Sequence, residues 1–337
     1  MKEAMLYIKE EEQKVRCNLC NHHCLIMPGK HGICGVRENR DGMLYSLVYG
    51  QVIARNIDPV EKKPLFHFHP GSKSYSIATV GCNFHCLFCQ NYEISQMPKD
   101  EKRIAGEPFP PEEVVAAAEK LKCKSISYTY TEPTIFFEYA YDSARLANDR
   151  GIKNVFVSNG YMGQEAIRAI QPYLHAANID LKAYSEKFYK EICGARLKPV
   201  LENLNLMKKL GIWVEVTTLI IPTLNDSEKE LQEIAAFIRT ELGPETPWHV
   251  SRFHPMYRLT SVPSTPVQTV LKARDIGLKA GLYYVYSGNI PGQGGENTYC
   301  HKCGALLIER LGFTILQYNV IDAKCPKCHA VVHGVGM

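Results

Sequence analysis

The sequence of this chain predicts an α/β fold built on a parallel β-sheet. Between residues 73 and 290, short apolar runs alternate with longer amphipathic stretches, which is the pattern of repeated strand and helix units. Gly151, Gly211, Gly243 and Gly281 follow four of the amphipathic stretches, where a helix commonly ends in a left-handed residue. Right-handed crossovers make the strands of such units parallel, in a sheet that is either open or curled into a barrel.

The apolar runs are the expected strands, and the amphipathic stretches between them are the expected helices. The strands are expected at 75–80, 125–130, 154–157, 177–181, 213–221, 250–253 and 282–286. The helices are expected at 111–121, 136–148, 164–174, 198–210, 227–240 and 267–280.

Composition narrows the class of protein. The 337 residues suit one large domain with small appendages, and 45% hydrophobic with 22% charged residues is usual for a soluble globular chain. A net charge of +4 carries no signal for nucleic-acid binding. Without a long apolar stretch or a signal peptide at the charged start, we expect a cytoplasmic protein with neither a membrane nor a nucleic-acid partner.

Thirteen cysteines in such a compartment indicate metal ligands or catalytic thiols rather than disulfides. Eleven of them fall into three groups, which divide the chain into a cysteine-rich region (1–72), a core (73–290) and a four-cysteine ribbon (291–337). The groups are Cys17, Cys20, Cys24 and Cys34; Cys82, Cys86 and Cys89; and Cys300, Cys303, Cys325 and Cys328. The remaining two, Cys123 and Cys193, are expected to be buried as small hydrophobic residues.

The middle group has the spacing C-x3-C-x2-C and directly follows the strand expected at 75–80. Three thiolates this close can hold three irons of a cubane cluster, which leaves the fourth iron open to a small molecule. A zinc knuckle, or buried free thiols, is the plainer alternative.

Polar residues follow the other expected strands. Because functional groups gather at the carboxyl ends of parallel strands, their joint placement predicts one functional rim, although each alone has a plainer explanation as a turn or a structural residue. They are Glu132 after the second strand, Ser158 and Asn159 after the third, Asp180 and Lys182 at the fourth, and His254 after the sixth.

The cysteine motif, the Glu132-Pro133 pair and the repeated βα units together resemble the radical S-adenosylmethionine (SAM) superfamily over residues 73–290. Within it, the Asn159-Gly160 pair, Asp180-Leu-Lys182 and the late His254 resemble the pyruvate formate-lyase activating enzyme branch. The resemblance implies a partial (β/α)6 parallel barrel.

The resemblance also implies roles. Cys82, Cys86 and Cys89 would ligate a [4Fe–4S] cluster, with the amine and carboxylate of SAM on its free iron. Reductive cleavage of SAM would give a 5′-deoxyadenosyl radical that removes hydrogen from a substrate. A one-electron donor such as flavodoxin or ferredoxin is the implied redox partner.

The other matched residues would contact SAM. Glu132 would accept from its amino group; Ser158 and Asn159 would lie near the ribose or carboxylate; Asp180 and Lys182 would orient the methionyl end; His254 would contact the ribose; and Phe88 would pack near the adenine or belong to the core. The family usually has two glycines where this chain has Tyr130 and Thr131, so the local backbone path is expected to differ slightly.

The last cysteine group has the spacing C-x2-C-x21-C-x2-C, formed by Cys300, Cys303, Cys325 and Cys328. Two such knuckles are typical of a closed tetrahedral zinc ribbon or a rubredoxin-like site. We expect structural zinc there, and iron is the alternative.

The first group, Cys17, Cys20, Cys24 and Cys34, fits either zinc or an auxiliary iron–sulfur cluster, and the spacing does not decide between them. Nearby histidines at 22, 23 and 31 are either competing ligands or, as we expect, solvated loop residues.

The whole layout resembles the AmmeMemoRadiSam-type radical SAM enzymes, which implies Memo-like and Ammecr-like partner proteins. Charged residues and histidines in 56–71 either cover the mouth of the active site or form a solvated loop. Three classes of function stay open: modification of a small molecule or peptide side chain, generation of a glycyl radical on a protein partner, and a non-enzymatic iron or zinc binding module.

Overall fold

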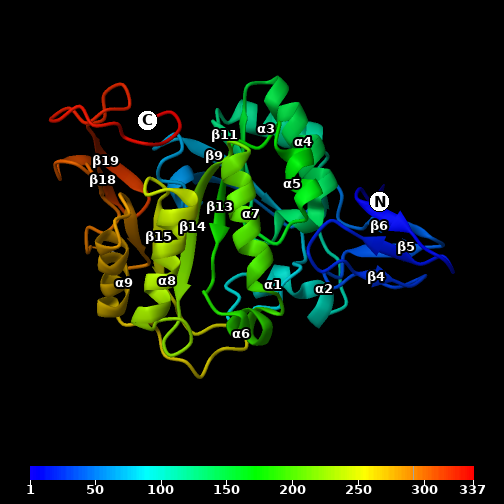
Figure 1. Cartoon of the computed structure of the whole chain (residues 1–337). Coiled ribbons are helices and arrows are strands. Elements are labelled where there is room, and N and C mark those ends of the chain that lie inside the picture. Colours follow the sequence, from blue (N-terminus) through cyan, green and yellow to red (C-terminus); the bar gives the residue numbers. More distant parts are fainter. Residues whose placement is uncertain (291) are drawn as a thin grey trace. The chain divides into compact units, whose positions relative to one another are not determined.

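The computed structural model describes residues 1–290 and 292–337, and the chain divides into two compact units. The first comprises 1–58, 73–176 and 193–195, and the second comprises 59–72, 177–192 and 196–337. The predicted ribbon boundary at residue 291 lies outside the described residues, and the three predicted segments stay a prediction. Figure 1 shows the elements of each unit along the chain.

The first unit contains three small antiparallel sheets, one of which includes Cys17 of the first cysteine group. One has the order β1–β6–β5, the second β2–β3–β4, and the third pairs β7 with β10. Their bounds are β1 Lys2–Glu3, β2 Tyr7–Lys9, β3 Val15–Cys17, β4 Leu25–Ile26, β5 Arg37–Arg40, β6 Met43–Ser46, β7 Gln51–Val52 and β10 Glu107–Pro108.

The larger sheet of the first unit confirms the predicted parallel pairing. Its strands are β8 (Ala54–Pro59), β9 (Lys73–Ala78), β11 (Ser125–Tyr128) and β12 (Lys153–Ser158), hydrogen-bonded in that order. Strand β11 pairs in parallel with both β9 and β12. The carboxyl ends of these three strands therefore meet at one edge, where the predicted polar residues follow them.

Helices α3 (Pro111–Lys120) and α4 (Phe137–Asp149) lie side by side against this sheet (Figure 1). A proline at the first helical position of α3 needs no backbone N–H partner, which explains its start. The other helices of the unit are α1 (Tyr92–Ser95), α2 (Met97–Asp100), the 3-10 helix η2 (Pro133–Phe136) and α5 (Gln164–Ile170). Helix α5 ends before the predicted residue 174, because Pro172 cannot donate to the helical ladder.

The second unit contains the strands β13 (Ala176–Asp180), β14 (Trp213–Ile220), β15 (Trp248–Arg252) and β16 (Val285–Gly288), again in sequence order. Strand β15 is parallel to both β14 and β16. Strand β16 begins later than predicted. The preceding apolar residues bond elsewhere, Leu282 N–H to Gly277 O and Tyr283 N–H to Pro244 O.

Amphipathic helices cover the strands of the second unit as predicted. Helix α7 (Leu197–Lys209) packs on β14, and α9 (Val267–Lys279) packs on β15, β16 and α8 (Glu228–Phe237). This unit also contains the short helix α6 (Glu186–Phe188) and two π-helical segments, η3 (Tyr189–Cys193) and η4 (Ile238–Leu242). The four glycines predicted to follow helices all have positive φ.

The carboxyl-terminal ribbon consists of β17 (Thr298–Tyr299), β18 (Leu306–Leu311) and β19 (Thr314–Tyr318), paired antiparallel. It packs against the segment 59–72, which begins with the 3-10 helix η1 (Val60–Lys62). Buried His67 bonds through Nδ1–H to the carbonyl of His333, and buried Arg310 donates to the carbonyl of Phe66. The solvated-loop alternative for this segment is therefore wrong, because its polar side chains anchor the ribbon. None of the described helices is long and apolar enough for a membrane crossing.

Candidate active site

The three cysteines of the middle group lie in a loop directly after β9. Gly81 precedes them with φ +106°, and its N–H bonds to the carbonyl of Ile94 in α1. Cys86 is buried, and the other two cysteines are half-buried. His85 N–H donates to the carbonyl of Cys193, so the start and the middle of the loop are both tied to neighbouring backbone. These hydrogen bonds hold the backbone that bears the three thiols in one conformation.

A polar network connects this loop to the end of β12. Asn159 donates from Nδ2 to Asn83 Oδ1 at 2.7 Å, and the same Nδ2 lies 3.9 Å from Cys82 Sγ. The backbone N–H of Asn159 donates to Glu132 Oε2 at 2.8 Å. The predicted residues Cys82, Glu132 and Asn159 therefore do lie together, with Asn83 as a member that the sequence did not single out.

Glu132 lies at the centre of this network and is 1% exposed. Its Oε1 accepts from Ser158 Oγ at 2.8 Å and from the N–H and hydroxyl of Thr134 at 3.0 and 2.5 Å. Burial raises the pKa of this carboxyl, and the donors around it oppose the rise. Oε2 accepts one hydrogen bond from these neighbours, which leaves acceptor capacity for an ammonium group.

Lys99 supplies positive charge beside the thiols and was missed by sequence reasoning. Its Nζ donates to the carbonyl of Phe84 at 2.7 Å, inside the cysteine loop. Burial lowers the pKa of Lys99, and the charges of Cys82, Cys34, Cys86 and Cys89 raise it. No sequence pattern marks this lysine, because only the fold of α2 brings it to the loop.

Burial also raises the pKa of Cys82 well above its usual range. A thiol in this position stays protonated unless a metal or cluster takes its proton's place. The buried Nδ2 of Asn83 has no hydrogen-bond partner among the described residues, so the loop also holds an unused donor. Three convergent thiols, a lysine and a spare N–H donor fit the thiolates and sulfides of an iron–sulfur cluster.

Tyr130 stands at one of the two positions where the radical SAM superfamily usually has glycine. It has φ +61°, a left-handed conformation that glycine adopts freely and tyrosine adopts at a cost. Its hydroxyl donates to Asp58 and accepts from Asn56, and its carbonyl accepts from Asn91 Nδ2. The backbone therefore keeps a glycine-like conformation here, held by these contacts.

The remaining predicted SAM contacts belong to the second unit. Lys182 Nζ forms an ion pair with Asp180 Oδ2 at 2.8 Å, and its backbone carbonyl accepts from Asn225. His254 is exposed and lies within hydrogen-bond distance of Ser264, at 3.2 Å. Each unit is described by itself, so the joint rim of these residues with Glu132 stays a prediction.

Three further residues lie where their hydrophobic character suggests. Phe88 is 4% exposed, and its predicted packing against an adenine stays a prediction. Cys123 and Cys193 are buried, as expected. Cys193 additionally fixes the cysteine loop through its carbonyl, a role that the sequence did not suggest.

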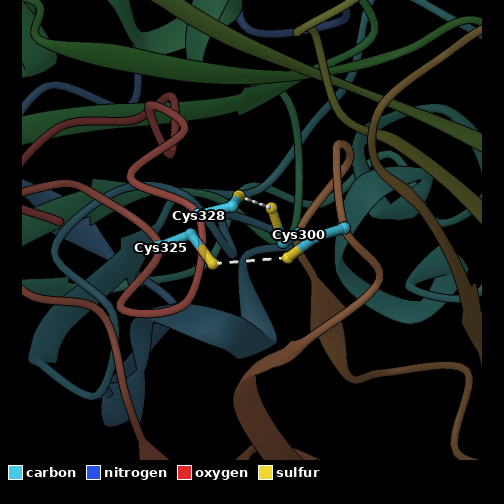
Figure 2. A group of neighbouring side chains, drawn as sticks. Cys300, Cys325 and Cys328 are labelled. Carbon is cyan, nitrogen blue, oxygen red and sulfur yellow. Dashed lines mark hydrogen bonds between the residues drawn. The ribbon is translucent and has the colours of Figure 1, made fainter.

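The last cysteine group forms a closed four-sulfur site. Figure 2 shows Cys300, Cys325 and Cys328 with their sulfur atoms directed toward one another. The Sγ atoms of all four cysteines lie within 4.8 Å of one another, with 3.6 Å from Cys300 to Cys328 and 3.7 Å from Cys303 to Cys325. Tetrahedral zinc with Zn–S bonds of about 2.3 Å requires Sγ separations of about 3.8 Å. The site therefore has the dimensions of a single bound ion.

Local electrostatics also suit a metal at this site. Burial raises the pKa of Cys325, but the backbone N–H groups of Cys328 and Lys327 and the neighbouring thiols lower it below its usual value, while the same thiols raise the pKa of Cys328. Each knuckle is followed by a left-handed residue, Gly304 with φ +70° and His329 with φ +59°. The turn that aims the second pair of sulfurs is thus made without glycine.

The first cysteine group lies in the first unit. Cys17 and Cys34 are buried, and Cys20 and Cys24 are half-buried. The expectation that the nearby histidines are solvated is wrong for His22, which is half-buried and donates from Nε2 to the carbonyl of Asn83 at 2.8 Å. His23 and His31 are exposed, as expected.

Comparison with known proteins agrees with this geometry. The family model of the radical SAM superfamily matches residues 76–238, which include the three cysteines, Glu132 and Asn159. An uncharacterised protein of Methanocaldococcus jannaschii, MJ0808, is 51% identical over 97% of this chain and 98% of its own length.

More distant proteins with described activities also match. The pyruvate formate-lyase-activating enzyme of Clostridium pasteurianum is 22% identical over 47% of this chain and 66% of its own length. Among solved structures, a radical SAM methyltransferase from Sphaerobacter thermophilus superposes with a TM-score of 0.52 at 14% identity, covering 71% of each chain. The likeness to the methyltransferase structure shows a shared fold only.

Proposed function

Because the chain belongs to the radical SAM superfamily and is distantly related to pyruvate formate-lyase activating enzymes, we propose that it cleaves SAM reductively and abstracts hydrogen from a substrate. Cys82, Cys86 and Cys89 would hold a [4Fe–4S] cluster through three of its irons. When bound, the cluster and SAM together supply a 5′-deoxyadenosyl radical.

One observation carries this proposal: the three-cysteine loop is hydrogen-bonded directly to the polar residues that follow the neighbouring strands. Asn159 contacts Asn83 beside Cys82 and, through its backbone, Glu132. A closed structural metal site needs no such connection to an acidic group at strand ends, whereas a cofactor chelated at the open iron needs partners there.

The chain's own residues would position SAM and exclude water. Glu132 is held by Thr134 and Ser158 so that its carboxylate cannot rotate, which favours binding of the methionyl ammonium at Oε2. Lys99 would offset the negative charge of the thiolates. We assign the Asp180 and Lys182 ion pair to the methionyl end, His254 to the ribose and Phe88 to the adenine.

At the carboxyl terminus we propose structural zinc. The Sγ separations of 3.6 and 3.7 Å support one tetrahedral ion, and the buried residues Leu307, Ile308 and Val332 pack around the site. A ribbon of this size has too small a core to fold without such a cross-link.

The substrate class is a separate proposal. The AmmeMemoRadiSam-type layout supports modification of a small molecule or peptide side chain, together with Memo-like and Ammecr-like proteins and a flavodoxin or ferredoxin as electron donor. The likeness to a pyruvate formate-lyase-activating enzyme supports a second candidate, a glycyl radical generated on a protein partner. Electron paramagnetic resonance (EPR) of mixtures with candidate partners separates them, because only the second candidate leaves a stable protein radical.

The test of the proposed function is release of 5′-deoxyadenosine by the anaerobically reconstituted, reduced full chain incubated with SAM. We expect the product from the wild type and its loss in a Cys82→Ala, Cys86→Ala, Cys89→Ala variant. Cys123→Ala is the matched control, because it removes a buried thiol outside the metal groups. A protein with its cluster intact that never released 5′-deoxyadenosine would refute the proposal.

A further inference from the structure

The first cysteine group is the strongest unassigned site in the described part of the chain, because its four thiols converge on one place. Cys17 ends β3, and its N–H bonds to the carbonyl of Cys24. An ideal Cβ on Gly32 would lie 3.8 Å from the sulfurs of both Cys24 and Cys34. Cys20 lies in the turn between Cys17 and Cys24, where its carbonyl accepts from the N–H of His23.

The spacing of these thiols differs from that of the zinc-sized group. Among the described residues, the quartet at Cys300, Cys303, Cys325 and Cys328 is the group whose ligand atoms all lie within 4.8 Å of one another. Neither the first group nor the middle triplet forms such a set. Four thiolates on the corners of a cubane must stand farther apart than four thiolates on one ion. Among the described residues, therefore, no three sulfurs of the first group or of the triplet meet the spacing of a single tetrahedral ion.

A buried arginine three residues after Cys34 has one unused donor. Arg37 is 2% exposed and pairs with Glu138 through both terminal nitrogens, at 3.1 and 2.6 Å. Its third donor, Nε, is buried and has no hydrogen-bond partner among the described residues. Arg37 interacts electrostatically with Cys17 and Cys34. A cluster with four thiolates carries net negative charge, which this guanidinium would help to balance.

The site lies directly against the loop of the middle triplet. A Cβ on Gly81 would lie 3.3 Å from the carbonyl oxygen of Cys34, and Gly81 is the residue before Cys82. His22 bonds to the carbonyl of Asn83, the residue after Cys82. The backbone of the first cysteine group is therefore in direct contact with the loop of the triplet.

We propose that Cys17, Cys20, Cys24 and Cys34 hold an auxiliary [4Fe–4S] cluster that passes electrons to the cluster at Cys82, Cys86 and Cys89. This inference rests on the proposed function for its acceptor. A reduced one-electron carrier protein of the flavodoxin or ferredoxin class would reduce the auxiliary cluster from its 2+ to its 1+ state. The auxiliary cluster would then return to 2+ as the second cluster went from 2+ to 1+, so that one electron would move and no proton or bond would change.

Metal and sulfide content of the anaerobically reconstituted full chain tests the site. Each cluster carries four irons and four sulfides, so we expect about eight of each in the wild type and about four in a Cys17→Ser, Cys20→Ser variant. A variant at Cys82, Cys86 and Cys89 should also keep about four. Zinc should stay at about one per chain in all of them, because Cys300 and Cys303 are untouched.

The outcomes separate the two proposals. About two zinc ions and four irons per wild-type chain would overturn the auxiliary cluster and leave the proposed function standing. An unchanged iron content in the variant of the middle triplet would contradict the proposed function instead. If the double variant does not fold, Cys24→Ser at a half-buried position replaces it, and an altered EPR signal with the triplet's signal retained is the expected result.

The relay is tested by changing the electron donor. In the Cys24→Ser variant, 5′-deoxyadenosine formation driven by a reduced flavodoxin should fall at least tenfold, while formation driven by dithionite should stay near the wild-type rate. Equal rates of the variant and the wild type with flavodoxin would overturn the relay. An equal loss with both reductants would also overturn it, since the variant would then damage the second cluster itself.

Discussion

Substitution of Gly81 by alanine tests the contact between the first cysteine group and the triplet loop. The added Cβ would lie 2.9 Å from Val36 Cγ1 and 3.3 Å from the carbonyl oxygen of Cys34. The backbone φ of +106° is also one that alanine rarely adopts. Left-handed conformation costs roughly 1–2 kcal/mol, and overpacking costs roughly 1–3 kcal/mol. Together they should lower the free energy of unfolding by about 2–5 kcal/mol.

The assay is thermal unfolding of the anaerobic holoprotein, in which this loss corresponds to a fall in Tm on the order of 10 °C. Gly151→Ala is the matched control, because Gly151 has φ +71° but no atom within 4 Å of an added Cβ. It should show the conformational cost alone. Adding Val36→Ala to Gly81→Ala should recover part of the difference, since the closest contact is removed. Equal unfolding temperatures for the Gly81 and Gly151 variants would refute the close packing of the two cysteine groups.

Three other predictions concern single groups. Glu132→Gln should lower the free energy of unfolding by roughly 1–3 kcal/mol and slow 5′-deoxyadenosine release. In one orientation the new NH2 group faces the N–H of Asn159, and in the other it faces the three donors at Oε1. An unchanged Tm and an unchanged rate would contradict this. His329→Gly should raise the Tm, because it relieves a left-handed conformation that costs roughly 1–2 kcal/mol, partly offset by about 0.4–1 kcal/mol from the freer unfolded chain. Gly304→Ala should lower the Tm, and calorimetry of both variants checks the signs. Burial lowers the pKa of His67 to about 4, so the unfolded chain binds its proton first and stability should fall as the pH drops from about 6.5 toward 4. This loss amounts to roughly 3 kcal/mol, and chemical unfolding of His67→Gln should show a flatter pH profile over that range.

Much of the core fold could be predicted because strand and helix periods are local properties. Helix α9 was expected at 267–280 and is observed at Val267–Lys279. Strand β16 was placed too early because burial does not reveal which backbone groups pair, and Tyr283 bonds to Pro244 rather than to a strand. Strand β8 escaped prediction because Asn56 and Arg55 interrupt any apolar pattern.

In the candidate site, too, only the residues that lie close together in the sequence could be predicted. The cysteine triplet could be identified because its spacing is contained in eight residues. The Arg37 and Glu138 pair could not, since its members lie 101 residues apart and neither belongs to a motif. Lys99 likewise reaches the triplet only through the fold. A charged residue that stabilises thiolates over a long sequence separation leaves no local pattern.

The central claim is that the cluster at Cys82, Cys86 and Cys89 leaves one iron for SAM. Its most direct test is electron–nuclear double resonance of the reduced protein with SAM labelled with ¹⁵N in its amino group. The Cys17→Ser, Cys20→Ser variant is used so that the signal of the first group does not overlap. The account predicts a ¹⁵N coupling that requires SAM and disappears in the Cys82→Ala, Cys86→Ala, Cys89→Ala variant. A fully formed, reduced cluster that shows no coupling to the labelled amine at saturating SAM would contradict it.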